Sequence, residues 1–143
     1  MSVEPLLADS QAKLRAALAL VFASAASYAP FALDRVYSPR EREPYDALSD
    51  RFLRAFESSL KFFRTWERVR EAHASETFRD LLLRMEKVGL ISGLATWIGL
   101  RDLRNRVVHD YLPEELAALY AAIIGEAVPE FQRLDAAMAE RLR

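Results

Sequence analysis

The chain has 143 residues, no cysteine, four glycines and two histidines, with 20 basic and 21 acidic side chains. This length suits a single domain with its own hydrophobic core. The absence of cysteine excludes disulfides, iron–sulfur clusters and thiolate zinc sites, and two histidines are too few for an imidazole-rich metal site. Four glycines leave no phosphate-binding glycine loop. We therefore expect one domain over residues 1–143 that uses no metal and no cofactor.

The apolar residues favour helices over strands. Alanine and leucine number 23 and 21, whereas valine and isoleucine together number 12. The apolar stretch 14–29 is short for a membrane span, and it is preceded by the acidic Glu4 and Asp9 where a signal peptide needs positive charge. We predict an all-helical cytoplasmic protein that does not bind a membrane.

The first helix is predicted from about Asp9 or Ser10, either of which is a good N-cap, to Tyr28. The following stretch, from 29 to 44, contains three prolines around a charged run. Because proline disfavours the interior of a helix, this stretch is predicted to be a long connection inside one bundle.

The second helix is predicted from about Tyr45 to Glu71, and it is strongly amphipathic. Its apolar positions recur every three or four residues: Tyr45, Leu48, Phe52, Phe56, Leu60 and Phe63. Basic residues recur on the opposite face: Arg51, Arg54, Lys61, Arg64 and Arg68. The window 51–70 carries a net charge of +4. A basic stripe of this kind is either a solvated helix face or a surface that binds a polyanion such as RNA, and the spacing leaves both open.

A third helix is predicted from about Ser75 to Val88, with Gly89 as a left-handed stop. A fourth follows from residue 92 or 93 to Tyr111. A fifth starts at Pro113, and Pro129 should kink or break it. Trp97 on the fourth helix is predicted to be a core residue. The expected architecture is an antiparallel, up-and-down bundle of four to five helices.

The segment 101–111, at the end of the fourth predicted helix, concentrates polar residues that can do chemistry. Arg101, Asn105 and His109 form one row on such a helix, and Arg104 starts a neighbouring row that ends at Tyr111. A histidine can move a proton at a ribose hydroxyl near neutral pH, and a guanidinium fits a phosphate and its pentacoordinate transition state. This pair suffices for metal-free RNA cleavage.

The spacing also has plainer explanations. On an ideal helix, Arg104 and His109 point about 140° apart, so one copy is not expected to close a site alone. His109 at a helix C-terminus can simply complement the helix dipole, and Tyr111 can be a core residue with its hydroxyl at the rim. The other histidine, His73, is predicted to be an exposed turn residue.

The signature Arg104-Asn105-x-x-x-His109-x-Tyr111 resembles that of HEPN-domain proteins, and specifically of HepT-like toxins. The resemblance extends to several aromatic and apolar positions over about residues 9–125: Phe52, Phe56, Phe63, Trp66, the Gly-Leu-Ile at 89–91, Trp97, and Leu119 to Ile123. These are similar to the family's nucleotidyltransferase-substrate-binding subfamily.

This resemblance implies a HEPN-like helical homodimer with metal-independent endoribonuclease activity, belonging to a toxin–antitoxin pair. It implies that Arg104 stabilises the phosphorane, that His109 is the general acid or base, and that Asn105 orients it. A two-fold axis would bring His109 of one chain towards Arg104 of the other. Tyr111 would be the residue that a cognate minimal nucleotidyltransferase, the antitoxin, modifies with AMP.

The same resemblance implies RNA as substrate, with Arg101 and the basic stripe as RNA-binding residues. Some members of this group are not active nucleases, so a second hypothesis stays open. In that alternative, the chain is a non-catalytic binding subunit that docks a nucleotidyltransferase.

Overall fold

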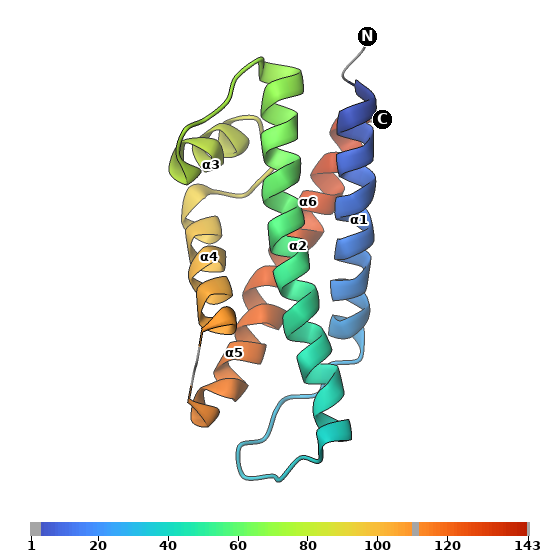
Figure 1. The fold of residues 1–143 in the computed structure, drawn as a ribbon, viewed down its shortest axis with the longest axis vertical. Helices are drawn as coiled ribbons and strands as arrows, with labels where there is room; N and C mark the ends of the chain where they lie inside the picture. The colour runs from blue at the N-terminus through green and yellow to red at the C-terminus, as the bar shows by residue number, and fades with distance from the viewer. Residues whose placement is uncertain (1–3, 110–111, 143) are drawn as a thin grey trace.

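The computed structural model describes residues 4–109 and 112–142, which form helices and no strand (Figure 1). Helix α1 (Glu4–Ala26) runs antiparallel to α2 (Pro39–Glu71), which is the longest element, about 50 Å at 1.5 Å per residue. The remaining elements are α3 (Phe78–Lys87), α4 (Leu94–Val108), a 3-10 turn (Pro113–Glu115), α5 (Leu116–Ala122), a π-helical turn (Ile123–Ala127) and α6 (Val128–Arg141). The predicted all-helical, up-and-down bundle is confirmed.

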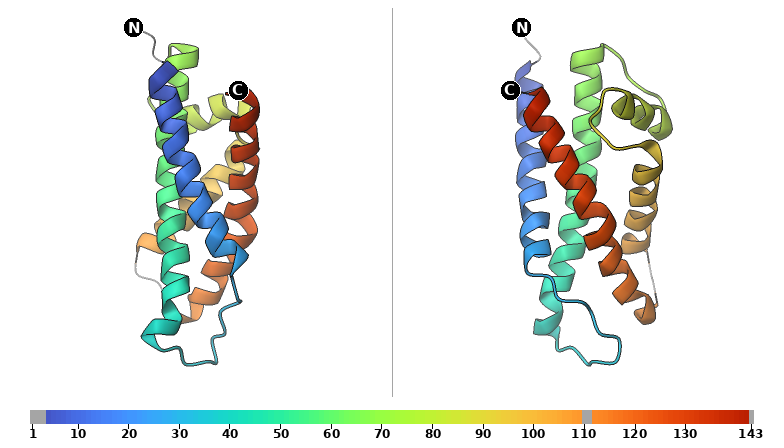
Figure 2. Two further views of the ribbon diagram at one scale, coloured as in Figure 1. Left: turned by 90° about the vertical axis from the view of Figure 1, so that its right-hand side faces the viewer. Right: turned by 180° about the vertical axis from the view of Figure 1, so that it is seen from behind.

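The helices reverse direction along the chain. α4 runs antiparallel to α2 on the side away from α1, and the short α3 lies across the end of the bundle between them (Figure 1). Seen from behind, α5 and α6 run obliquely from the end of α4 towards the upper part of α1 (Figure 2). The two termini therefore lie at the same end of the molecule, and the α1–α2 connection lies at the other.

Both of the first two helices begin earlier than the sequence predicts. α1 starts at Glu4, not at Asp9 or Ser10. Leu7 is buried in line with Leu14 and Leu18, so the apolar face of the helix begins two turns before Leu14. It ends at Ala26, two residues before the predicted Tyr28. The predicted N-caps are therefore interior helix positions.

α2 starts six residues before the predicted Tyr45. Ser38 is its N-cap: the Ser38 hydroxyl accepts from the Glu41 N–H (3.1 Å), and the Glu41 carboxylate accepts from the Ser38 N–H (3.0 Å). Pro39 occupies the first helical position, where its missing N–H costs no hydrogen bond. Pro44 lies inside the helix, and the prediction of a connection up to that residue is wrong.

α3 starts at Phe78, three residues after the predicted Ser75, with Thr77 as N-cap. Gly89 has a φ of +81° after α3 ends, which confirms the predicted left-handed stop. Pro129 does interrupt regular α-helix, as predicted: the Val128 N–H bonds to the Ile123 carbonyl, five residues back, in the π turn that precedes the proline.

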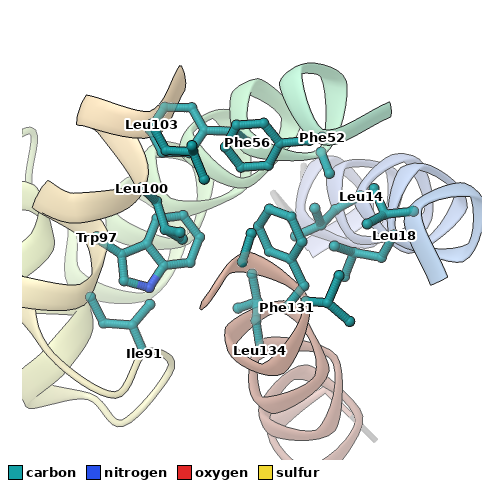
Figure 3. Close-up of a cluster of buried hydrophobic side chains, with 14 of the residues drawn as sticks. Leu14, Leu18, Phe52, Phe56, Ile91, Trp97, Leu100, Leu103, Phe131 and Leu134 are labelled. Atoms are coloured by element: carbon teal, nitrogen blue, oxygen red, sulfur yellow. The ribbon is translucent and has the colours of Figure 1, made fainter. Parts of the chain in front are cut away.

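The core lies between α1, α2, α4 and α6 (Figure 3). Trp97 is fully buried, as predicted, and its ring packs against Phe56, Phe63 and Phe131 at centroid distances of 6.0, 5.0 and 6.2 Å. The aromatic positions of α2 thus face α4 and α6. This packing fixes the position of α4 against α2, and the candidate site lies at the C-terminal half of α4.

Two buried glutamates hold the connections around α3. Glu67 accepts from the Ser75 N–H (2.7 Å) and hydroxyl and pairs with Arg84 (3.1 Å). Glu130 accepts from the Trp97 indole N–H (2.8 Å) and the Ser92 N–H (3.0 Å). These carboxylates satisfy loop amides that would otherwise be buried without a partner.

None of the helices in the two described ranges combines the length and the apolar character that crossing a bilayer requires.

Candidate functional site

The polar segment lies at the C-terminal half of α4, but the helix ends earlier than predicted. Its last residue is Val108, and His109 is the C-cap with extended backbone (φ −96°, ψ 162°). Val107 and Val108 are β-branched and weak helix formers, and Pro113 disfavours helical geometry at the residue before it. The predicted helical row of Arg101, Asn105 and His109 is therefore wrong at its last member.

His109 is exposed, and its backbone N–H bonds to the Asn105 carbonyl at 3.1 Å. Because His109 has left the helix, the 140° separation expected from ideal helical geometry does not apply to its ring. Asn105 is half-buried on the last turns of α4, and no bond from its side chain to the imidazole is found in the described part of the chain.

Arg104 lies in the seam between α4 and α2. Its guanidinium carbon is 5.7 Å from the centroid of the Phe56 ring, and its closest approach to Glu57 is 3.5 Å, between Nε and Oε1. The Nε atom is buried and makes no hydrogen bond with the described residues. Arg104 is thus placed by a ring beneath it and by a loose ion pair, while its side chain stays 31% exposed.

Sequence reasoning missed Glu57. It occupies an ordinary exposed position in the basic stretch of α2, so its charge alone gave no signal. Only the packing of α4 against α2 brings it to Arg104. The signal that was available is that a lone acidic residue interrupts the basic face one turn before Lys61.

The predicted basic stripe divides into parts. Lys61, Arg64 and Arg68 line one shallow hollow of about 460 Å³ that also includes Ser75. Lys61 also lines a second hollow of about 400 Å³, together with Arg54 and Glu57. The two hollows therefore meet at Lys61, and Glu57 connects the second one to Arg104.

Arg51 does not lie on this stripe, contrary to the prediction. Its Nη1 donates to the Ser24 hydroxyl (2.9 Å) and to the Leu20 carbonyl (3.3 Å), both on α1. Arg54 does lie on the stripe, but it pairs with Asp50 at 3.0 Å. Arg101 lies one turn before Arg104 on α4, with its guanidinium 5.1 Å from the Phe78 ring centroid.

The end of α4 is tied to the start of the next helical segment. Arg106 approaches Glu115 of the 3-10 turn to 3.8 Å. Val108 and Leu112 are 50% and 56% exposed, so apolar side chains flank this region. Tyr111, the predicted modified residue, lies outside the described residues.

His73 is exposed in the α2–α3 connection, as predicted. No group of three or more histidine, cysteine, aspartate or glutamate side chains in the described ranges is arranged to hold a metal ion. The metal-free mechanism stays a prediction.

Comparison with known proteins gives a partial match. A stretch of 46 residues is 39% identical to "Probable ribonuclease HepT" of Haemophilus influenzae (strain ATCC 51907 / DSM 11121 / KW20 / Rd), covering 32% of this chain and 32% of that protein. The match thus spans about a third of the length of that curated relative. No family model and no solved structure matches the chain. The similarity agrees with a HepT-like protein at a coarse level.

Proposed function

We propose that this chain is a metal-independent endoribonuclease, the toxin subunit of a toxin–antitoxin pair, with Arg104 and His109 as its catalytic residues. The observation that carries the proposal is the position of these two side chains at the end of α4: one is a partly exposed guanidinium over Phe56, and the other is an exposed imidazole outside the helix. The partial similarity to a curated probable ribonuclease supports it.

The proposed reaction is an internal phosphoryl transfer. The ribose 2′-oxygen forms a bond to the adjacent phosphorus while the bond from phosphorus to the 5′-oxygen breaks, which leaves a 2′,3′-cyclic phosphate and a 5′-hydroxyl. His109 takes the proton from the 2′-hydroxyl or gives one to the leaving 5′-oxygen. Arg104 stabilises the charge on the phosphorane, and Asn105 orients the imidazole.

Two chains are needed in this proposal. A homodimer with a two-fold axis would place His109 of one protomer near Arg104 of the other, so each reaction centre would combine both chains. The half-exposed Val108 and Leu112 beside the site provide apolar surface for such a contact.

RNA is proposed to follow the exposed face of α2. Lys61 lies four residues after Glu57, about 6 Å further along the helix axis, and Arg64 and Arg68 continue in the same direction. Arg54 and Arg101 are proposed to add charge beside the reaction centre. A phosphodiester approaching Arg104 would replace part of its weak contact with Glu57.

The experiment compares the two histidines. Purified protein should cleave RNA in the presence of EDTA and yield 2′,3′-cyclic phosphate ends, detected by mass spectrometry. His109→Ala should lower the cleavage rate by about 10²–10⁴-fold, the usual contribution of a general acid or base. His73→Ala is the matched control, because it removes the other exposed imidazole, and it should cleave like the unaltered protein. Equal cleavage by His109→Ala would refute the catalytic assignment.

A second candidate is a non-catalytic subunit that docks a nucleotidyltransferase. The pairing of Arg104 with Glu57 favours it, because the guanidinium charge is partly neutralised. In this case, the unmodified protein binds the nucleotidyltransferase but does not cleave RNA. In both cases, we propose the partner modifies Tyr111 with AMP, which intact-mass analysis of the Tyr111 peptide would detect as an adenylyl adduct.

A further inference from the structure

A hollow of about 320 Å³ lies between the end of α1 and the first turns of α2. The connection between these two helices is at the end of the molecule opposite the termini (Figure 1). Its walls come from both helices and from the connection between them. The residues that matter for recognition are Ser24, Tyr28, Arg35, Tyr37, Tyr45 and Arg51. This hollow shares no lining residue with the hollows along the α2 stripe.

Aromatic side chains form one wall, and they are held in place. Tyr45 is buried, and its hydroxyl donates to the Ala29 carbonyl at 2.6 Å. The Tyr37 hydroxyl accepts from the Ala32 N–H at 3.0 Å. The rings of Tyr28 and Tyr37 lie edge-on to Tyr45, at centroid distances of 6.3 and 5.7 Å. Phe31 stacks on the Tyr37 ring at a centroid distance of 4.5 Å, so this wall is rigid. The half-buried Tyr28 is the part of the wall that can contact a bound ring.

Two arginines, Arg35 and Arg51, also line the hollow, and they differ in how their charges are compensated. Arg35 forms an ion pair with Glu41 and lies 4.5 Å from the Tyr37 ring centroid, so its charge is compensated. Arg51 forms no ion pair with any described residue; its Nη1 is fixed by Ser24 and by the Leu20 carbonyl. Arg51 is therefore an oriented guanidinium whose remaining N–H groups have no partner in the described chain.

Residues with hydroxyl groups also line the hollow, and a hydroxyl can donate a hydrogen bond to a phosphate, whereas a carboxylate would repel it. Ser24, Ser27 and Tyr28 all line the hollow. Burial raises the pKa of Tyr28, so this hydroxyl remains a donor well above neutral pH. Among the described residues, Glu41 is the one carboxylate that lines the hollow, and it is already bonded to the Ser38 N–H and paired with Arg35.

We propose that this corner hollow binds a mononucleotide, with its phosphate on Arg51 and its base against the tyrosine wall. A volume of about 320 Å³ is at the lower end of the range for small-molecule pockets, which suits one nucleotide rather than two. The forked donors of a guanidinium match a phosphate, and the half-buried Tyr28 ring offers an apolar contact to the base. This site is independent of the proposed cleavage reaction.

The test is an NMR titration of the full chain with 5′-AMP, with adenosine and inorganic phosphate as separate probes. AMP should shift the backbone amides of residues 24–28 and 45–51, and it should bind more tightly than either probe. Arg51→Ala should weaken AMP binding by about 10–100-fold, the usual effect of losing hydrogen bonds to a charged group. Arg40→Ala is the matched control: it removes an exposed charge from the same end of α2, outside the hollow, and should bind AMP normally.

The outcomes separate clearly. No AMP-induced shift at millimolar concentration, shifts confined to Lys61, Arg64 and Arg68, or phosphate binding as tightly as AMP would each overturn the proposal. Equal binding by folded Arg51→Ala would do the same. If Arg51→Ala unfolds because the contact with Ser24 is lost, Arg51→Lys and the shift map of the unaltered protein decide. An inactive but AMP-binding protein would leave this inference standing while the proposed nuclease function fails.

Discussion

Glutamates stabilise two regions of this molecule in opposite ways. Around α3, Glu67 and Glu130 are 1% and 2% exposed, and both accept short hydrogen bonds from loop amides. At the end of α4, the Glu57 side chain is 50% exposed and only approaches Arg104 at 3.5 Å. The buried carboxylates are permanent parts of the fold. The exposed one holds an arginine loosely enough that a phosphate can compete for it.

The largest expected effect is on RNA cleavage, in the region where the exposed Glu57 pairs loosely with Arg104. Arg104→Ala should lower the rate of RNA cleavage by about 10²–10³-fold, as losing a transition-state donor usually does, with little change in the free energy of unfolding. Cleavage kinetics and chemical denaturation on the same preparation measure both quantities. Arg79→Ala, an exposed arginine on α3, should leave both unchanged. A large loss of stability with Arg104→Ala would show that this arginine belongs to the fold.

In the region of the buried glutamates, a substitution should affect the stability of the fold. Glu130→Ala leaves the Trp97 indole N–H and the Ser92 N–H without an acceptor, and should lower the free energy of unfolding by about 3 kcal/mol. Urea denaturation measures it. Glu126→Ala changes an exposed glutamate in the neighbouring π turn and should have almost no effect. A similar, small loss in both variants would contradict the assigned role of Glu130.

A variant of Glu57 tests whether this carboxylate orients Arg104 for catalysis or competes with RNA for it. Because its closest atom approaches Nε, the terminal nitrogens of Arg104 lie further from this carboxylate and can face a phosphate. Glu57→Ala should therefore lower kcat about tenfold, or about 1.4 kcal/mol in the barrier, with little change in KM. Asp46→Ala removes an exposed carboxylate from the same helix, away from the basic stripe, and serves as control. A rise in activity would mean that Glu57 restrains Arg104 instead of orienting it.

The smallest effect belongs to the capping box of Ser38 and the exposed Glu41, at the start of α2. Ser38→Ala removes one half of the capping box and should cost about 1 kcal/mol in the free energy of unfolding. Thermal denaturation of this variant at neutral pH measures the loss. No measurable change would show that Pro39 and the helix interior define the start of α2 without the cap.

Acid should weaken the same cap. The Ser38 backbone N–H is the main cause that lowers the pKa of Glu41, followed by the Ser38 side chain and Arg35. A carboxyl whose folded pKa is lowered stabilises the fold above its unfolded pKa, and this contribution is lost as the pH falls through the folded pKa. Glu41→Gln, which removes the titrating carboxyl, should therefore show a weaker loss of stability between neutral and acidic pH than the unaltered chain.

The features of the fold that depend on apolar periodicity and on helix stop signals could be predicted from the sequence. The helical class, the apolar face of α2, the burial of Trp97 and the stop at Gly89 follow from spacing and local chemistry, and the structure confirms them. Helix starts were less predictable, because a capping box at Ser38 outweighs the local disfavour for a proline at position 44.

Long-range polar contacts could not be predicted. Glu57, Glu67 and Glu130 look like ordinary surface glutamates until tertiary packing brings Arg104, Ser75 and Trp97 to them. The same holds for Arg51, whose helical spacing placed it on the stripe but whose side chain bonds to α1. The spacing along the sequence predicts on which face of its own helix a residue lies. It does not predict which side chains the neighbouring helix brings to that face.

The π turn between α5 and α6 adds one residue to an otherwise α-helical rod. Each residue turns an α-helix by about 100°, so this insertion rotates everything that precedes it relative to α6. With this rotation, Tyr120 before the turn and Phe131 after it are both buried. Deleting Gly125 would turn the outer face of α5 towards the core and carry Glu115 away from Arg106. The approach of Arg106 to Glu115 thus depends on a single extra residue about ten positions after Glu115 in the chain.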